Sequence, residues 1–133
     1  SDKAEPDRYA AMQLQDASPL NKKLLKARFS TDGGYYEKAT AVLNSITPKE
    51  LATLKDQTEY YYRKARLAHN TGEIAEAKIL YQQSIDMTRD NPWYFGANSA
   101  LQLGYIAKDQ RNYTVARKYF QMALDSLHDS MMC

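Results

Sequence analysis

Small residues recur in one register through most of this 133-residue chain. The first set, spaced 38 and then 39 residues apart, is Ala27, Ala65 and Gly104. A second set follows twelve positions after the first, at Ala39, Ala77 and Ala116. Two α-helices can cross at short distance only where the facing side chains are small. The register therefore predicts three pairs of closely crossing helices, and no other feature of the sequence constrains the fold as much.

Larger side chains keep the same register. The second helix of each pair is expected to open on an apolar anchor, at Tyr36, Ile74 and Tyr113. Four residues after each second small residue stands a large side chain, at Leu43, Tyr81 and Phe120. Three positions further come Ile46, Ser84 and Ala123. Spacings of three and four place these residues on one helical face, where they fill the space beside each crossing.

The turn between the helices of each pair is marked by polar residues and glycine. The three turns have the sequences TDGG (31–34), NTGE (70–73) and DQRN (109–112). Gly34 and Gly72 occupy the same offset, where a helix end favours a residue that tolerates positive φ. The third pair has Arg111 at this offset, so its turn is expected to be less favourable.

This threefold pattern resembles the tetratricopeptide repeat (TPR) family over residues 20–127. The resemblance implies an all-α fold, a right-handed solenoid of antiparallel helical hairpins. We expect an N-terminal tail and short helix over 1–19, either a cap or the end of an earlier repeat, and three repeats over about 20–48, 49–88 and 91–128. The family repeat is about 34 residues long, so the extra residues belong to the connections.

The connections carry helix-start signals of their own. Thr47, Pro48 and Glu50 form a capping box with proline at the first helical position. Asn91 and Pro92 repeat the arrangement before the third repeat. The first helices of repeats two and three are therefore expected to be a turn or more longer than usual. The aromatic run Trp93–Phe95 is expected to pack on the second helix of repeat two, around Leu80 and Ile85.

Composition argues against several classes of function. Lys and Arg total 18 against 16 Asp and Glu, so no strong net field favours nucleic acid or a membrane surface. The chain has 2 His and 1 Cys, far apart in sequence, and no glycine-rich phosphate loop. No apolar run approaches the roughly 20 residues that span a bilayer. We therefore expect no enzymatic activity, catalytic residue, metal site, cofactor or membrane insertion.

The TPR resemblance places candidate partner-binding residues on the first helix of each repeat, lining a concave groove. In repeat one the matching positions are Asn21, Leu24, Arg28, Thr31 and Asp32. In repeat two they are Glu59, Tyr62, Arg66, His69 and Asn70. In repeat three they are Asn98, Leu101, Tyr105, Lys108 and Asp109. Arginine, tyrosine and amide side chains suit the recognition of a peptide or protein segment, with an acidic peptide as one option.

Two alternatives to groove binding stay open. The chain could be a structural segment of a longer repeat protein, or an assembly module that associates with itself through the ends of the array. Alternatively, the basic and aromatic run EYYYRKARLAHN (59–70) could bind nucleic acid by phosphate contacts and base stacking. Residues of one helix fan out by 100° each, however, so this run cannot share a single face.

Overall fold

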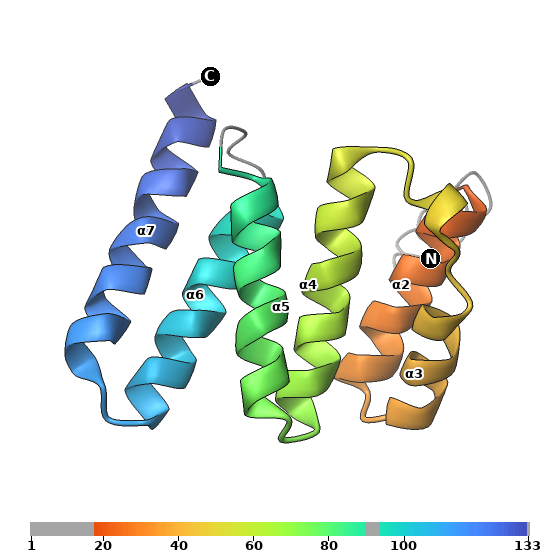
Figure 1. Ribbon diagram of the computed structural model, residues 1–133, viewed down its shortest axis with the longest axis horizontal. Helices are drawn as coiled ribbons and strands as arrows, with labels where there is room; N and C mark the ends of the chain where they lie inside the picture. The colour runs from red at the N-terminus through yellow and green to blue at the C-terminus, as the bar shows by residue number, and fades with distance from the viewer. Residues whose placement is uncertain (1–17, 90–93, 133) are drawn as a thin grey trace, which may run out of the picture. The chain divides into compact units, whose positions relative to one another are not determined.

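The computed structural model describes residues 18–89 and 94–132 of the chain. Within these ranges the chain forms six α-helices, one 3₁₀ helix and no strand, as an all-α prediction requires (Figure 1). The first hairpin comprises α2 (Pro19–Asp32) and α3 (Tyr36–Asn44), and the 3₁₀ helix η1 (Pro48–Glu50) follows it. The second comprises α4 (Leu54–Asn70) and α5 (Ile74–Met87), and the third comprises α6 (Tyr94–Asp109) and α7 (Tyr113–Met132).

The chain divides into two compact units, Ser1–Glu50 and Leu51–Cys133, and each is described by itself. In the first unit α2 packs on α3. In the second unit α4 packs on α5 and α6 packs on α7, while α6 also packs against α5 and, over a smaller contact, α4. In the second unit, the first helix of the third hairpin therefore packs against both helices of the second hairpin.

The helices cross where the register of small residues predicts. Ala65 on α4 and Ala77 on α5 are both 0% exposed, and so are the corresponding alanines of the first unit. In the third hairpin, Gly104 lies so close to α7 that an added Cβ atom would come within 2.4 Å of Phe120 Cε1. The prediction of three close crossings is confirmed.

The larger side chains of the register also lie where the sequence places them. Leu43 in the first unit and Tyr81 in the second are fully buried beside their crossings. Tyr81 belongs to an apolar core cluster contributed by α4, α5 and α6. The buried members of this core cluster are Tyr62, Ala65, Ala68, Ala77, Leu80, Tyr81, Leu103 and Ile106. The second helices begin at Tyr36, Ile74 and Tyr113, as predicted, although Tyr113 is mostly exposed.

All three hairpins turn at a residue of positive φ. The values are 83° at Gly34, 84° at Gly72 and 62° at Arg111. In each turn the following amide donates to the carbonyl oxygen five residues back, at 2.7 Å from Tyr35 to Ser30, 2.8 Å from Glu73 to Ala68 and 2.8 Å from Asn112 to Ala107. The third turn thus has the same geometry as the other two but places an arginine where glycine is favoured, as predicted.

Replacing Arg111 by glycine is expected to raise the free energy of unfolding by about 1 kcal/mol, because a side chain at positive φ is strained and glycine is not. Urea unfolding of the two proteins measures the difference. The matched control is Arg117→Gly on the exposed side of α7, which is expected to lower stability by about 1 kcal/mol because glycine is unfavourable in a helix interior. A loss of stability in both variants would contradict the strained turn.

The capping box before the second repeat forms, but it does not lengthen the helix. Glu50 Oε1 accepts from Lys23 Nζ at 3.0 Å and from the Thr47 amide at 3.1 Å. These two hydrogen bonds hold the pKa of the Glu50 carboxyl group below its ordinary value, and the bond from Lys23 has the larger effect. Helical structure ends after the single turn η1, and α4 begins afresh at Leu54 with Thr53 as its N-cap. A helical segment therefore begins at Pro48, as predicted, but it is a separate 3₁₀ turn and does not extend α4.

Hydrogen bonds at the junction explain the interruption. Thr53 Oγ1 accepts from the Asp56 amide at 3.1 Å, which gives α4 its own cap. Gln57 Nε2 donates to the Leu51 carbonyl oxygen at 2.8 Å, so a backbone group between the two helices is satisfied by a side chain instead of by helix continuation. The corresponding signals at Asn91 and Pro92 and the helix expected over 6–16 lie outside the described residues.

Candidate functional site

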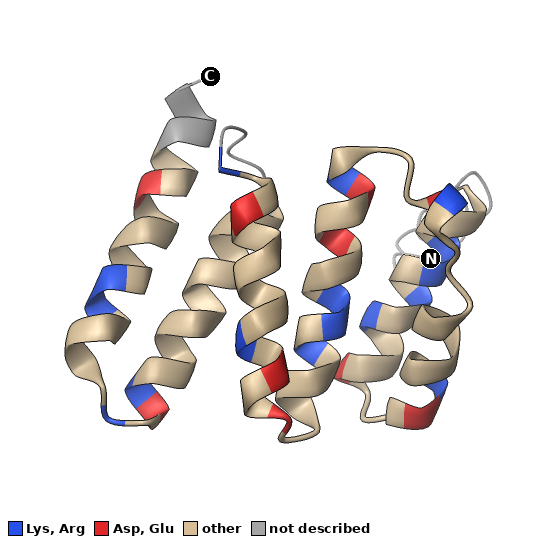
Figure 2. Cartoon of the chain, viewed as in Figure 1, with Lys and Arg blue, Asp and Glu red and all other residues tan. Residues whose placement is uncertain are grey.

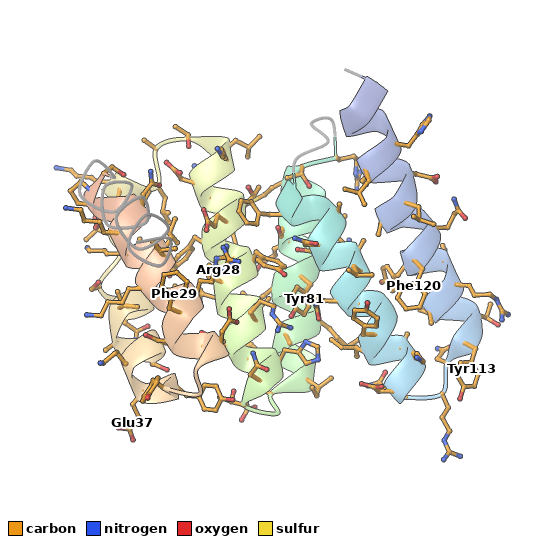
Figure 3. All side chains as sticks on the ribbon, turned by 180° about the vertical axis from the view of Figure 1, so that it is seen from behind. Arg28, Phe29, Glu37, Tyr81, Tyr113 and Phe120 are labelled. Atoms are coloured by element: carbon orange, nitrogen blue, oxygen red, sulfur yellow. The ribbon has the colours of Figure 1, made fainter. Side chains whose placement is uncertain are left out.

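Four polar side chains of the second unit join α4, α5 and α6. Arg66 Nη1 on α4 donates to Gln102 Oε1 on α6 at 3.0 Å. The same nitrogen lies 3.4 Å from the Tyr81 hydroxyl oxygen on α5, and that oxygen lies 3.0 Å from His69 Nδ1. Figure 3, which views the chain from behind, shows Tyr81 directed from α5 toward the first helices. We call these four residues the Arg66 cluster.

The protonation states of the cluster follow from its surroundings. Burial raises the pKa of Tyr81 to about 12, although Arg66 opposes the rise, so its hydroxyl group keeps its proton. The hydroxyl oxygen can then accept from Arg66 and donate its proton to His69 Nδ1. Burial and the charge of Arg66 lower the pKa of His69, while Asp109 acts in the opposite direction. His69 is therefore neutral at neutral pH, and the tautomer that leaves Nδ1 without a proton allows it to accept from the Tyr81 hydroxyl group.

This arrangement predicts a loss of stability in mild acid. The pKa of His69 is lower in the folded chain than its ordinary value of 6.5, so the unfolded chain binds more protons as the pH falls below that value. The contribution of neutral His69 is fully present above this range and is lost as the pH falls toward the lowered pKa. Unfolding measured between about pH 7.5 and pH 5 is expected to show this loss.

The histidine responsible can be identified by substitution. His69→Gln keeps a neutral side chain that can accept from Tyr81, so the decrease in stability between neutral and mildly acidic pH should shrink. His128→Gln, on the exposed part of α7, is the control and should retain the full decrease. A pH dependence that is unchanged by His69→Gln would contradict the assignment.

The structure places most of the predicted binding residues at or near the surface. Those that are exposed are Asn21, Arg28, Asp32, Asn70, Tyr105, Lys108 and Asp109. Those that are half-buried are Glu59, Arg66, His69, Asn98 and Leu101. The first three of the exposed residues belong to the first unit and the rest belong to the second. Within the second unit, Arg66, His69 and Asn70 on α4 and Gln102 and Asp109 on α6 form one polar surface, which we call the α4–α6 face.

The sequence position of Tyr62 suggested that it lines an open groove, but in the structure its side chain is buried. It is 6% exposed, and its ring centroid lies 6.0 Å from that of Tyr81 and 5.6 Å from that of Phe95. The cause is α6, whose first turns cover this part of α4. Leu24 and Thr31 are likewise buried within the first unit. Of the aromatic run Trp93–Phe95, Phe95 packs against the core cluster of repeat two, whereas the side chains of Trp93 and Tyr94 lie outside the described residues.

The basic and aromatic run 59–70 is divided among several roles. Arg63 forms a 3.0 Å ion pair with Glu59, and its guanidinium group lies 5.3 Å from the ring of Tyr62 and 5.4 Å from that of Phe95. Lys64 lies over the ring of Tyr60, at 5.3 Å from its centroid. These cations and rings contact one another or the core, so the run does not form one exposed basic surface.

Two members of the Arg66 cluster could not be recognised as site residues from the sequence. Tyr81 was assigned only to packing, and Gln102 lies 36 residues from Arg66. The available signal was the repeat register. Gln102 follows Leu101 and lies one helical turn before Tyr105, and both of these were predicted as binding residues on the same helix. A pairing between residues of different hairpins depends on how the hairpins pack, and the sequence alone does not give that geometry.

Among the described residues, two features are absent. In the ranges 18–89 and 94–132, no three His, Cys, Asp or Glu side chains gather in a group that could hold a metal ion. None of the helices described is both long and apolar enough to cross a membrane. The site consists of hydrogen-bonding side chains fixed on neighbouring helices, an arrangement that is suited to binding.

Antiparallel helical hairpins in a shared register, with polar side chains displayed by their first helices, define a helical-repeat protein. Residues 58–91 match the family model of the tetratricopeptide repeat, and this segment covers most of α4 and all of α5. The resemblance to the tetratricopeptide repeat is confirmed by this segment, and the six described α-helices are consistent with TPR-like repeats. Repeats of this family generally mediate protein–protein interaction or scaffolding and are typically non-catalytic. Comparison with curated proteins and with solved structures gave no match.

Proposed function

We propose that the chain is a non-catalytic interaction module, in which three TPR-like repeats after the 1–19 segment form a right-handed solenoid. A peptide or protein segment binds along the first helices, in the concave groove. The observation that carries this proposal is the 3.0 Å hydrogen bond between Arg66 on α4 and Gln102 on α6, which joins the polar side chains of two successive first helices.

Preorganisation is the physical reason why this face suits recognition. Binding costs free energy when long side chains must be ordered, at about 0.5–1.5 kcal/mol for each one. On the α4–α6 face, Arg66 and His69 are already held by Tyr81 and Gln102, and Asn70 Nδ2 donates to the Arg66 carbonyl oxygen at 3.0 Å. A partner therefore meets groups whose positions are largely fixed, and the loss of entropy on binding is smaller.

The predicted groove offers cations to carboxylate groups of a partner, although Arg28, Arg66 and Lys108 are balanced there by the carboxylates Asp32, Glu59 and Asp109. Arg28 is exposed on α2 in the first unit, and Lys108 is exposed near the end of α6 in the second. Figure 2 shows Lys and Arg positions on both helices, and Asp and Glu positions as well. Arg66, on α4, lies beside Gln102 and Tyr81. Arginine binds carboxylate groups through paired N–H donors, which gives such contacts geometric specificity. Within the second unit, a carboxylate group of a bound segment can pair with the exposed Lys108 on α6.

A pair of variants tests the proposed face. The tagged chain is used to capture its partners, and each partner is then titrated with purified protein. Asn70→Ala combined with Asp109→Ala changes two exposed residues of the α4–α6 face and is expected to weaken binding by about tenfold or more, which corresponds to about 1.4 kcal/mol. The matched control is Glu76→Ala combined with Lys78→Ala, two exposed residues of α5.

The two pairs separate groove binding from other modes. The proposal expects the control pair to bind like the original chain and both pairs to keep the thermal stability of the original chain within a few degrees. Equal affinities for the two pairs would contradict binding at the α4–α6 face. Charge reversal at Arg66 is a poor test, because it would also break the bonds to Gln102 and Tyr81 and so destabilise the fold.

A further inference from the structure

The third hairpin has an apolar groove that no described residue fills. It lies between α6 and α7 and has a volume of about 400 Å³. Its lining residues are Ala97, Asn98, Leu101, Tyr105, Lys108, Phe120, Ala123, Leu124 and Leu127. Leu124 and Leu127 are 59% and 46% exposed, and together they contribute apolar surface to one groove. Figure 3 shows Phe120 between α6 and α7, and we call this surface the α6–α7 groove.

The second hairpin has an equivalent groove, and the structure shows what occupies it. Moving back 39 positions, Leu101 corresponds to Tyr62 and Leu127 to Thr88. The ring of Tyr62 contacts Phe95, and Gly96 lies so close to Thr88 that an added Cβ atom would fall 2.1 Å from Thr88 Oγ1. Phe95 and Gly96 belong to α6. A groove of this kind in this protein is therefore filled by an α-helix that packs on both helices of the hairpin.

Differences between the two grooves specify the occupant. Five polar positions of the second hairpin are replaced by less polar ones in the third: Thr58 by Ala97, Arg66 by Tyr105, Tyr81 by Phe120, Ser84 by Ala123 and Thr88 by Leu127. In the second hairpin Arg66 requires a polar partner, Gln102, on the helix that docks there. The α6–α7 groove lacks that guanidinium group. Its occupant therefore needs an apolar residue in the place of Gln102 and an uninterrupted apolar stripe.

Charge specifies one further position. Lys108 corresponds to His69, and His69 is close enough to Asp109 for that carboxylate to raise its pKa. Asp109 lies on the docked helix α6, seven residues after Gln102. The equivalent position of an occupant of the α6–α7 groove would face Lys108. A carboxylate there would form an ion pair with Lys108 near the surface.

We propose that the α6–α7 groove is a docking surface for an amphipathic α-helix of a partner protein. The helix has a continuous apolar stripe and an acidic residue seven positions after the residue that takes the place of Gln102. The residues that define the α4–α6 face do not line this surface, although four residues predicted for the concave groove do: Asn98, Leu101, Tyr105 and Lys108. The inference does not depend on the function proposed above.

A peptide derived from α6 serves as the probe. A fluorescein-labelled peptide with the sequence of residues 94–109 and the change Gln102→Leu carries both specified features. Its binding to the full chain is followed by fluorescence anisotropy. We expect saturable binding that Leu124→Asp weakens by about tenfold or more, because the substitution places a charge in the apolar groove. The matched control is Ile79→Asp on α5, at another exposed apolar residue, and it should bind like the original chain.

A charge exchange tests the register. The same peptide with Asp109→Lys is expected to bind the original chain about two- to fivefold more weakly, and Lys108→Glu in the chain is expected to restore its binding. The Asn70→Ala and Asp109→Ala pair in the chain should bind the probe normally, which separates this surface from the α4–α6 face. No binding to the original chain, equal losses for Leu124→Asp and Ile79→Asp, or no recovery by Lys108→Glu would overturn the proposal.

Discussion

Truncation of Tyr81 to alanine is expected to lower the free energy of unfolding of the unit Leu51–Cys133 by about 3–5 kcal/mol. The side chain is 0% exposed and packs within the core cluster between α4, α5 and α6. Its removal leaves a cavity at the junction of two hairpins and withdraws the hydroxyl group from Arg66 and His69. Urea unfolding followed by far-UV circular dichroism measures the loss.

Tyr81→Phe separates the cavity from the hydrogen bonds. It keeps the ring and is expected to cost about 1–2 kcal/mol, since Arg66 and His69 lose one partner in a half-buried site. Phenylalanine already stands at this register position in the third hairpin, as Phe120, so the helix crossing itself tolerates it. A cost for Tyr81→Ala no larger than that for Tyr81→Phe would show that Tyr81 does not hold the hairpins together.

Enlargement of Ala65 to leucine is the second substitution with a large expected effect. Ala65 is 0% exposed at the crossing of α4 and α5, opposite Ala77 in the same core cluster. A leucine side chain would force these helices apart, and overpacking of this kind costs about 1–3 kcal/mol of unfolding free energy. The upper end of this range is expected here because the two helix backbones approach each other closely at Ala65. Thermal unfolding should show a lower midpoint.

The control for this substitution uses the same chemistry at an exposed site. Ala75→Leu on α5 changes a residue that faces solvent and is expected to alter the unfolding free energy by no more than about 0.5 kcal/mol. If Ala65→Leu were as well tolerated as Ala75→Leu, the small residues of the register would not be needed for close crossing, and the basis of the fold assignment would fail.

Much of the fold was predictable because short-range rules determine it. Ala65 and Gly104 mark crossings because only small side chains allow two backbones to approach, and this requirement is visible in spacing alone. Gly34, Gly72 and Arg111 mark turns because the end of each helix requires positive φ, so even the unfavourable third turn could be anticipated. Both rules act within one hairpin.

The remaining features depend on competition between neighbouring groups or on packing between hairpins. The capping box at Thr47 and Glu50 formed as predicted, yet Thr53 supplies a second cap and limits the first helical segment to one turn. Tyr62 was expected on an open face, but α6 covers it. The bond between Arg66 and Gln102 depends on the position of α6 against α4, which no local pattern encodes.

The measurement that tests the proposed function most directly is amide hydrogen exchange of the full chain with and without a captured partner. Exchange reports local opening residue by residue, so a bound segment slows exchange in the elements that it contacts or stabilises. The account predicts slower exchange in α4 and α6 around Arg66, Asn70 and Asp109, and little change in the exposed part of α5 around Lys78. Slower exchange around Lys78, with α4 and α6 unchanged, would contradict binding along the first helices.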